Sequence, residues 1–599
     1  MKRILAIAAI SLMSALTFNS CVDLDLNPLS EGSSSTWYST KEEVVMSLND
    51  FYRTDFFPLD DIVMGDDLVH RNSTCSWCNG SLTAENGTIA TRWQNYYKGI
   101  ARGLRLINNL ETKEISGISD AEKKQYEGEA YLYIGFAYGM IAFHWGQGIL
   151  DKTGMTLEEA YNAQLSSKAD LLAFSYECLD KAAEMLPESY GGIQRFTKGL
   201  AYAFKSRIAL YHGDYAECVK ASQKCMDLGV YKLHDNYEKL FTSSYSEENI
   251  FFFRGDVGLK KYYWLAGDSN NPNDVILRNH GGWGTRGISY ELLCAYTCID
   301  GKPIDESPLY NPRNLFENRD PRLAMTTVPF ATQEVIDKGN YNPADYAFLG
   351  IEYSPSPLKY EVMDFNTGNM RRNNDSKANA EHACYNGLPI KKFVDATWLE
   401  NGRGGAPTTY PFIRYGEVLL NYAEAAIESG KVSQEVLDKT INAVRDRAYK
   451  GTGIPAPHVS ASQSQAELRT AVRTERYVEL ALEGHRYCDV IRWKLAGKIY
   501  NTPVYYLNRA WAGANWSGDE SVVNDAYKRI IKNWREGSFP IHGVPEIDEN
   551  GFADLSSQVT DGYIVVAATR KFDESRDYLW PIPAGDRLVN PKLGQNPNW

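Results

Sequence analysis

The chain has 599 residues, a formal net charge of −13 and a pI of about 5.4. Proteins that bind nucleic-acid phosphates need a basic face, and this acidic chain has no long basic tract, so nucleic acid is excluded as an expected partner. Aromatic residues make up 12 % of the chain, with 13 Trp and 39 Tyr. Some of these must form core, and the remainder are available for flat, amphipathic binding surfaces.

Residues 1–20 have the pattern of a secretory signal. Lys2 and Arg3 precede an uncharged apolar run, 4–18, which is too short for a membrane span. Cys21 follows directly, which predicts a lipoprotein signal whose cysteine is acylated after cleavage. Phe18 and Asn19 replace the usual Leu and small residue of such a signal, so an ordinary secretory signal is the alternative. No later stretch approaches eighteen uncharged apolar residues, and the acyl chains would be the only membrane attachment.

After a Ser- and Gly-rich stretch typical of a flexible tether, helical patterns dominate the first part of the chain, about 91–229. The predicted helices are 91–110, 121–145, 171–186, 199–211 and 215–228. The last two, with the turn at His212 to Asp214, resemble a tetratricopeptide helical hairpin. Cys218 and Cys225 fall seven residues apart on one helix face, where we expect small buried side chains without chemistry.

A second helical block is predicted at about 412–495, with a helix–turn–helix from 412 to 449 and a helix from 464 to 482. Between the two blocks, about 239–411, the chain is rich in Asn, Gly, Pro and aromatic residues and shows no strong period. An irregular region set against a helical scaffold is typical of a binding surface.

Several segments resemble the SusD/RagB family of outer-membrane nutrient-binding lipoproteins. The closest is the charged block 472–493, which matches the family pattern ER-x-x-EL-x-x-EG-x-R-x-x-D-x-x-R-W at nearly every position. The blocks 413–425 and 442–448, the RDPR turn at 319–322, and the tail from Tyr578 to Pro597 also match in order. The match is loose in the first half of the chain and close in the second.

The resemblance implies a mostly α, SusD-like fold for one domain, 21–599, with four tetratricopeptide-like hairpins packed against an irregular, loop-rich ligand-binding region. It implies a lipoprotein anchored to the outer membrane and facing the cell exterior. Such proteins bind oligosaccharides, or peptides in the RagB branch, and deliver them to a SusC-like TonB-dependent transporter. The resemblance also implies that the chain is not an enzyme and has no cofactor.

Three carboxylates in the charged block, Glu475, Glu479 and Glu483, lie on one face of the predicted helix. Two paired carboxylates could serve as the acid and the base of a glycosidase. Like charges at this spacing repel unless they are countered. The nearby Arg473, Arg476, Arg486 and Arg492 supply counter-charges, so we expect an ion-pair network that fixes helices together. A glycoside hydrolase remains the alternative. No G-x-S-x-G or H-E-x-x-H motif is present, and no metal site is expected.

Glycan binding requires exposed aromatic rings that stack on sugars, with polar side chains beside them. The loop around Trp77 fits, with Asp66, Asp67 and Arg71 close in sequence. Trp283, between glycines, is a second candidate. The irregular region adds Tyr263, Trp264 and Arg372. For each of these aromatics, buried packing is the alternative, and Trp93, at helical spacing with Tyr97 and Ile100, is expected to be core.

Cys75 and Cys78 form a single CxxC pair. One such pair without a second is a weak metal signal, so a local disulfide or two unlinked thiols in a loop are the alternatives. Neither the identity of the ligand nor a role for calcium follows from the residues.

Overall fold

The structure is a computed structural model that describes residues 37–59, 61–70, 76–192, 194–256, 258–259, 274–312, 314–330, 339, 341–353, 361–375, 387–397, 408–507, 544–560 and 564–599. Predictions for Cys21, Arg71, Cys75, Tyr263 and Trp264 lie outside these residues. Within the described ranges, no helix combines the length and the apolar character needed to cross a bilayer.

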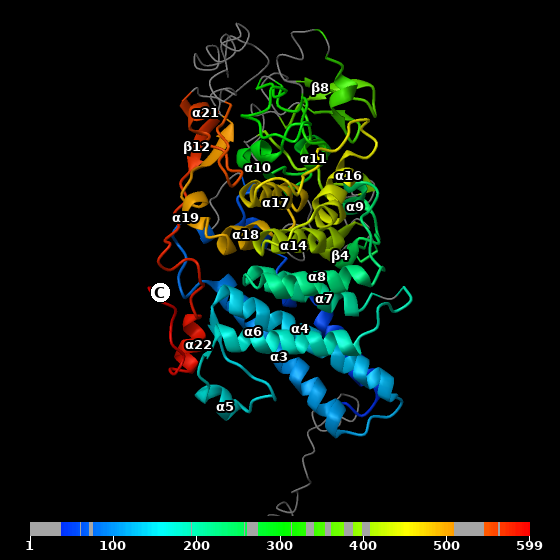
Figure 1. Cartoon of the computed structure of the whole chain (residues 1–599), viewed down its shortest axis with the longest axis vertical. Coiled ribbons are helices and arrows are strands. Elements are labelled where there is room, and N and C mark those ends of the chain that lie inside the picture. Colours follow the sequence, from blue (N-terminus) through cyan, green and yellow to red (C-terminus); the bar gives the residue numbers. More distant parts are fainter. Residues whose placement is uncertain are drawn as a thin grey trace, which may run out of the picture.

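The first helical block consists of α3 (Gly87–Thr112), α4 (Asp120–His144), α6 (Lys168–Met185), α7 (Lys198–Tyr211) and α8 (Tyr215–Asp227). Consecutive helices of this series pack against one another in the lower half of the molecule (Figure 1). Each predicted helix is present, with bounds that differ by at most four residues. Side chains at their N-caps, among them Ser119 and Thr197, accept hydrogen bonds from the first turn and fix where these helices begin.

The tight packing of this block depends on small residues. Within α4, a Cβ at Gly135 would lie 2.7 Å from Leu179, and one at Gly139 would lie 2.5 Å from Ile208. Cys218 and Cys225 are almost fully buried, and burial raises the pKa of both thiols to about 12. This confirms that the two cysteines act as small packing residues.

The second helical block contains α14 (Tyr415–Glu428), α15 (Gln434–Leu437), a π-helical turn (Asp438–Asn442), α16 (Ala443–Tyr449), α17 (Gln465–Glu479) and α18 (Arg486–Arg492). Helix α14 packs against α8 on one side and α17 on the other, and so joins the two blocks into one stack (Figure 1). The prediction placed the end of α17 at 482. The helix ends at Glu479 because the chain turns there, with Leu482 in the left-handed region at φ 63°.

The irregular region is built from short elements. Its helices are α9 (Tyr237–Thr242), α10 (Tyr290–Ala295) and α11 (Arg322–Thr326). Its strands pair antiparallel: β1 (Leu68–His70) with β5 (Arg286–Ile288), and β4 (Asn249–Arg254) with β10 (Thr409–Arg414). A four-stranded sheet runs in the order β6 (Ala347–Phe348), β7 (Ile351–Glu352), β8 (Glu361–Asp364) and β9 (Asn369–Arg372). Most of the irregular region, including α10, α11 and β8, lies above the second block in Figure 1, whereas α9 and β4 lie beside that block.

The remaining elements lie along the sides of the stack. They are α2 (Lys41–Asn49), α5 (Leu157–Asn162), α19 (Ala496–Ile499), α21 (Ser556–Thr560) and α22 (Ala584–Val589), with β2 (Gln147–Gly148) paired to β3 (Ser166–Ser167) and β11 (Val504–Leu507) paired to β12 (Ile564–Ala568). Short 3₁₀ turns complete the fold, including Asp50–Tyr52, Thr54–Phe56, Asp61–Met64, Ser76–Cys78, Arg278–His280 and Pro343–Tyr346.

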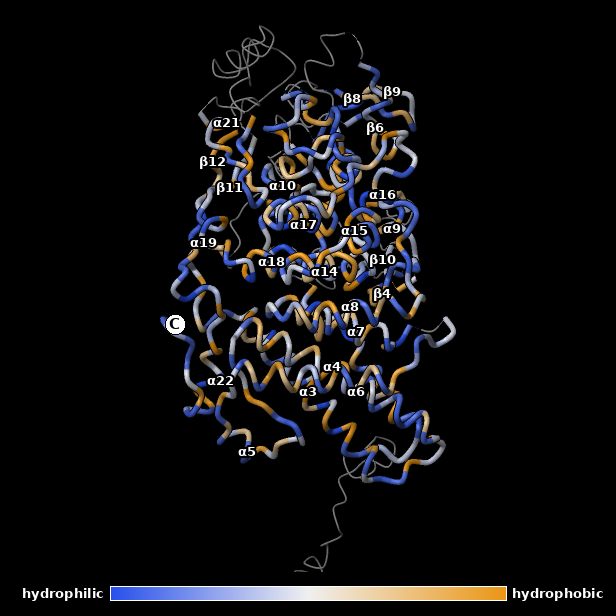
Figure 2. The backbone as a smooth tube through the Cα atoms, viewed as in Figure 1, coloured by the Kyte–Doolittle hydropathy of each residue, from blue (hydrophilic) through white to orange (hydrophobic). Residues whose placement is uncertain are grey.

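One large hydrophobic core runs through both halves, and apolar and hydrophilic stretches alternate along the stacked helices (Figure 2). Trp93, Trp145 and Trp580 are among its largest fully buried side chains, which confirms Trp93 as core. The Trp145 indole donates to the carbonyl of Pro581 at 3.0 Å and ties the C-terminal tail to the end of α4. The mostly α fold is therefore as expected, and the sheets of the described residues are small, with two to four strands each.

Candidate ligand-binding site

The charged block at 472–493 forms a buried ion-pair network. Glu475, Glu479 and Glu483 are each at least 95 % buried. Arg322 of the RDPR turn pairs with Glu475 at 2.6 Å and with Glu479 at 2.8 Å, and Arg414 pairs with Glu479 at 2.8 Å and Glu483 at 2.7 Å. Although burial alone would raise the pKa of Glu479, arginines 447, 414 and 322 lower it to about 2. All three carboxylates are thus held as ion pairs.

The network confirms an ion-pair role for the block, but the partners we predicted from the sequence are wrong. Arg476 pairs with Asp489, Arg486 with Asp66, and Arg492 with Glu424. The glutamates are instead countered by cations distant in sequence, namely Arg322, Lys392, Arg414, Arg445 and Arg447. Because α17 packs against α11 and α14, its buried face meets those elements and not its own chain neighbours.

Asp66 and Asp67 do not form an exposed polar loop, and this prediction is wrong. Both are buried, at 0 % and 1 % exposure. Asp66 accepts from the Arg486 guanidinium at 2.6 Å, and this pairing outweighs burial and lowers the pKa of Asp66. Asp67 accepts from the backbone N–H of Leu482 at 2.9 Å, while burial raises its pKa to about 6. Both carboxylates fasten the start of β1 to the charged block.

Trp77 is also buried, at 7 % exposure, so the expected exposed ring is contradicted. Its ring stacks on Trp580 with centroids 4.6 Å apart and planes at 29°. Trp580 in turn stacks on His144 at 3.9 Å. Since Trp580 belongs to the matched C-terminal tail, the loop around Trp77 is a packing surface for that tail.

Trp283 is the predicted aromatic that the structure leaves exposed, at 41 %. Its loop is closed by backbone hydrogen bonds: Thr285 donates to the carbonyl of Asp274, Gly284 to that of Ile276, and Gly282 to that of Leu277, at 2.8 to 3.0 Å. A Cβ at Gly282 would lie 2.0 Å from the Ile276 carbonyl oxygen, so only glycine fits beside the tryptophan. The ring is therefore presented on a fixed backbone.

Two further residues, Arg278 and Asp375, complete the Trp283 loop. The Arg278 guanidinium carbon lies 5.3 Å from the centroid of the Trp283 ring. Asp375 accepts from the backbone N–H groups of Arg278 and Asn279 at 2.7 and 2.9 Å and so clamps the 3₁₀ turn beneath the ring. Burial raises the pKa of Asp375 to about 6.

We did not single out Arg278 or Asp375 from the sequence. Arg278 lies five residues before Trp283, a spacing without meaning until the loop is closed, and Asp375 comes from a segment 92 residues away from Trp283. Arg372, which we did predict, is exposed on β9, three residues before Asp375, opposite Glu361 in the strand register. It therefore lies on the segment that clamps the loop.

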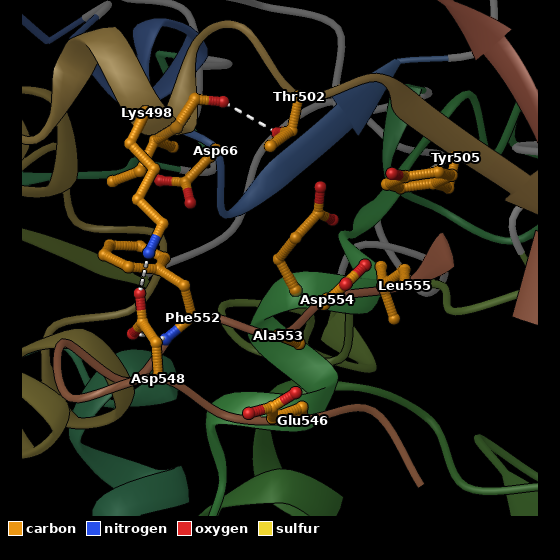
Figure 3. A pocket seen from close by; sticks show the side chains of 12 residues that line it. Asp66, Lys498, Thr502, Tyr505, Glu546, Asp548, Phe552, Ala553, Asp554 and Leu555 are labelled. Carbon is orange, nitrogen blue, oxygen red and sulfur yellow. Dashed lines mark hydrogen bonds and ion pairs between the residues drawn. The ribbon is translucent and has the colours of Figure 1, made fainter. Parts of the chain in front are cut away.

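A cavity of about 300 Å³ lies beside α19 and β11. It is at the end of the β1–β5 ribbon where β1 begins and β5 ends, away from the Trp283 loop. Figure 3 shows Lys498 and Asp548 joined across it, with Thr502, Tyr505 and Asp554 around it. Its lining is rich in carboxylates: Asp66, Glu291, Glu546, Asp548 and Asp554. Burial raises the pKa of Glu291, which lies 3.6 Å from Arg570. Among the described residues, no group of three His, Cys, Asp or Glu side chains is arranged to hold a metal ion.

The two stacked helical blocks and the irregular region define a mostly α protein with small sheets, and comparison with known proteins identifies its family. The model of the SusD family matches residues 247–599, more than half of the chain, and the chain belongs to this family. A second model, described as starch-binding associating with the outer membrane, matches residues 49–210.

Relatives match over most of their length. A SusD-like protein of Bacteroides ovatus is 22 % identical over 98 % of this chain and 96 % of its own, and SusD-like protein P2 of Formosa agariphila is 23 % identical over 81 % and 90 %. A solved SusD-like carbohydrate-binding protein from Bacteroides fragilis superposes with a TM-score of 0.71 at 26 % identity, covering 93 % of this chain and 100 % of that one.

Proposed function

We propose that this protein is an outer-membrane lipoprotein, anchored through Cys21 and facing the cell exterior, that binds oligosaccharides and hands them to a SusC-like TonB-dependent transporter. The observation that carries the proposal is the Trp283 loop. Its ring is 41 % exposed on a backbone closed by hydrogen bonds, which is what stacking on the C–H face of a sugar requires. Family membership and the name of the Bacteroides fragilis relative support a carbohydrate as the ligand.

The proposals of a lipid anchor and of a transporter partner are supported by the sequence and by the family. The signal-like residues 1–20 before Cys21 and the outer-membrane description of the matched family model both favour export and surface attachment. The transporter is what membership of the SusD family implies. Radiolabelled palmitate incorporation in the native host, lost in a Cys21→Ala variant, tests the anchor. Co-purification of a barrel protein with the tagged full-length chain tests the partner.

We further propose that the protein binds without catalysis. The carboxylates that suggested a glycosidase, Glu475, Glu479 and Glu483, are locked in buried ion pairs and have no route to a substrate. A working acid–base pair needs one carboxyl with a raised pKa facing the scissile bond. At Glu479 and Glu483 the neighbouring cations instead lower the pKa and stabilise the ionised form.

The test is a binding and turnover experiment on the mature chain. Calorimetry and affinity electrophoresis across a panel of glycans are expected to find at least one ligand, and overnight incubation with it is expected to release no new reducing ends. Binding of peptides without any glycan would assign the chain to the RagB-like branch. Release of product that disappears on changing a single carboxylate would establish a glycoside hydrolase.

A further inference from the structure

Arg278 has guanidinium donors that the described residues leave largely unused, although the nearby Asp375 carboxylate attracts its charge. In the part of the chain that the structure describes, its guanidinium forms no ion pair, while its η1 nitrogen makes one long contact of 3.4 Å with the Gly282 carbonyl and its buried ε nitrogen has no acceptor. The Asp375 carboxylate is close, but both of its oxygens accept backbone N–H groups. An arginine in this state has donors left for a ligand.

Neighbouring arginines are different. Arg286 lies 3.6 Å from Asp274, and Arg371 lies 3.3 Å from Asp364, so each has a carboxylate of its own. The protein as a whole has a net charge of −13, which disfavours anions everywhere except where a cation is placed locally. Arg278 thus differs from these two arginines in having no guanidinium contact to a carboxylate in the described structure, and it lies next to an exposed aromatic ring.

The position of the guanidinium leaves room on the ring. The Arg278 guanidinium carbon lies over the Trp283 ring at 5.3 Å from its centroid, and Trp283 still keeps 41 % of its surface exposed. A sugar stacked on the open part of the ring therefore has its substituents beside the guanidinium. Planar guanidinium pairs well with a carboxylate or a sulfate oxygen group, and such charge-assisted hydrogen bonds are stronger than those to a neutral hydroxyl.

We propose that the Trp283 loop selects acidic saccharides, with Trp283 stacking on the sugar ring and Arg278 binding the anionic group of a uronic acid or a sulfate ester. This inference rests on the proposed glycan-binding function and adds the class of ligand. Asp375 is then a positioning residue, because the hydrogen bonds that it accepts from the backbone N–H groups of Arg278 and Asn279 fix the backbone from which the Arg278 side chain extends.

The experiment compares, on the mature protein, pairs of ligands that differ only in one kind of charged group. One pair is an oligogalacturonate and its carboxyl-reduced counterpart, and the other is a carrageenan oligosaccharide, which carries sulfate esters without uronate, and its desulfated counterpart, so the two arms separate uronate from sulfate. Calorimetry is run with the wild type, Arg278→Gln and Arg278→Lys. Lys450→Gln, which removes the same charge from an exposed helix end, is the control.

We expect at least one acidic ligand to bind about tenfold more tightly than its neutral counterpart, equivalent to about 1.4 kcal/mol. Arg278→Gln is expected to abolish that preference, Arg278→Lys to keep part of it, and Lys450→Gln to leave it unchanged. Affinity for the acidic ligand is expected to fall as salt is raised. Thermal unfolding of the variants checks that the loop change has not unfolded the chain.

A neutral counterpart that binds as tightly as the acidic one, or a preference that survives Arg278→Gln, would overturn the inference and leave glycan binding intact. The same holds if only neutral glycans from the wider panel bind. Failure of every glycan to bind would remove the proposed function itself. If Arg278→Gln lowers acidic and neutral binding equally and Arg278→Lys does the same, Arg278 only supports the loop, and the inference is wrong.

Discussion

The charged block around Glu479 and the loop around Trp283 show opposite uses of polar chemistry. In the block, Arg322, Arg414 and Arg447 all pair with the buried carboxylate of Glu479, and these ion pairs hold the surrounding elements together. In the loop, Arg278 lies over the ring of the exposed Trp283, and hydrogen bonds of the backbone fix the conformation of the loop. The comparison teaches that the residues of the matched charged motif stabilise the scaffold, while a residue that we propose for ligand recognition, Arg278, has little sequence signal.

The largest effect is expected from breaking the block. Arg414→Met leaves the carboxylates of Glu248, Glu479 and Glu483 buried without one of their shared cations, and removing one partner of a buried pair costs about 3–5 kcal/mol of unfolding free energy. Urea unfolding measures this loss. The control is Lys450→Ala at the exposed pair with Asp235, for which about 0–1 kcal/mol is expected. Equal effects in the two variants would contradict the structural role of the block.

Acid should weaken the protein through this block and through other buried ionisable groups. The folded-state pKa of Glu417 and of Glu479 is about 2, so their stabilisation is present above about 4.5 and is lost as the pH falls towards 2. His485 and His212, with pKa values lowered by burial to about 4, add a loss that begins below 6.5. The raised pKa of Asp67 and of Asp375 opposes this between about 3.8 and 6.

The net expectation is that the unfolding midpoint falls steadily as the pH is lowered from 6.5 to 3, measured by thermal melts in buffers of constant ionic strength. A midpoint that rises over this range would mean that the two aspartates outweigh the block. Asp67→Asn and Asp375→Asn, which remove the opposing groups, are expected to steepen the fall.

A smaller effect, on binding alone, is expected from Gly282→Ala. The added Cβ would lie 2.0 Å from the Ile276 carbonyl oxygen, so the backbone beside Trp283 must move. Glycan affinity is expected to fall several-fold with little change in the unfolding midpoint. Gly368→Ala, at a surface turn where a Cβ meets nothing within 4 Å but φ is 72°, controls for strain in the backbone.

Much of the scaffold is predictable from the sequence, and the reason is local. Helices such as α4 and α7 have apolar periodicity and capping residues within their own segments, so their bounds follow to within a few residues. The ion-pair role of Glu475 and Glu479 also follows from like charges at helical spacing. Their partners do not, because Arg322 and Arg414 reach them only through tertiary packing.

The binding site is predictable only in part. Trp283 follows from its glycine neighbours, but Trp77 looks equally exposed in sequence and is covered by Trp580, about 500 residues later. From the sequence, Asp66 and Asp67 look like polar residues of an exposed loop. The available signal against this was Arg486 of the matched motif, which pairs with the Asp66 carboxylate. Arg278 and Asp375 depend on a contact between distant segments that no periodicity encodes.

The most direct test of the account is the glycan affinity of Trp283→Ala measured beside Trp77→Ala. For Trp283→Ala we predict at least a tenfold loss of affinity for the best ligand of the panel, with an unchanged unfolding midpoint, because an exposed ring carries binding and not stability. For Trp77→Ala we predict a lowered midpoint with affinity retained by the folded protein. Full affinity in Trp283→Ala, or lost affinity in a folded Trp77→Ala, would contradict the assignment of binding to the Trp283 loop.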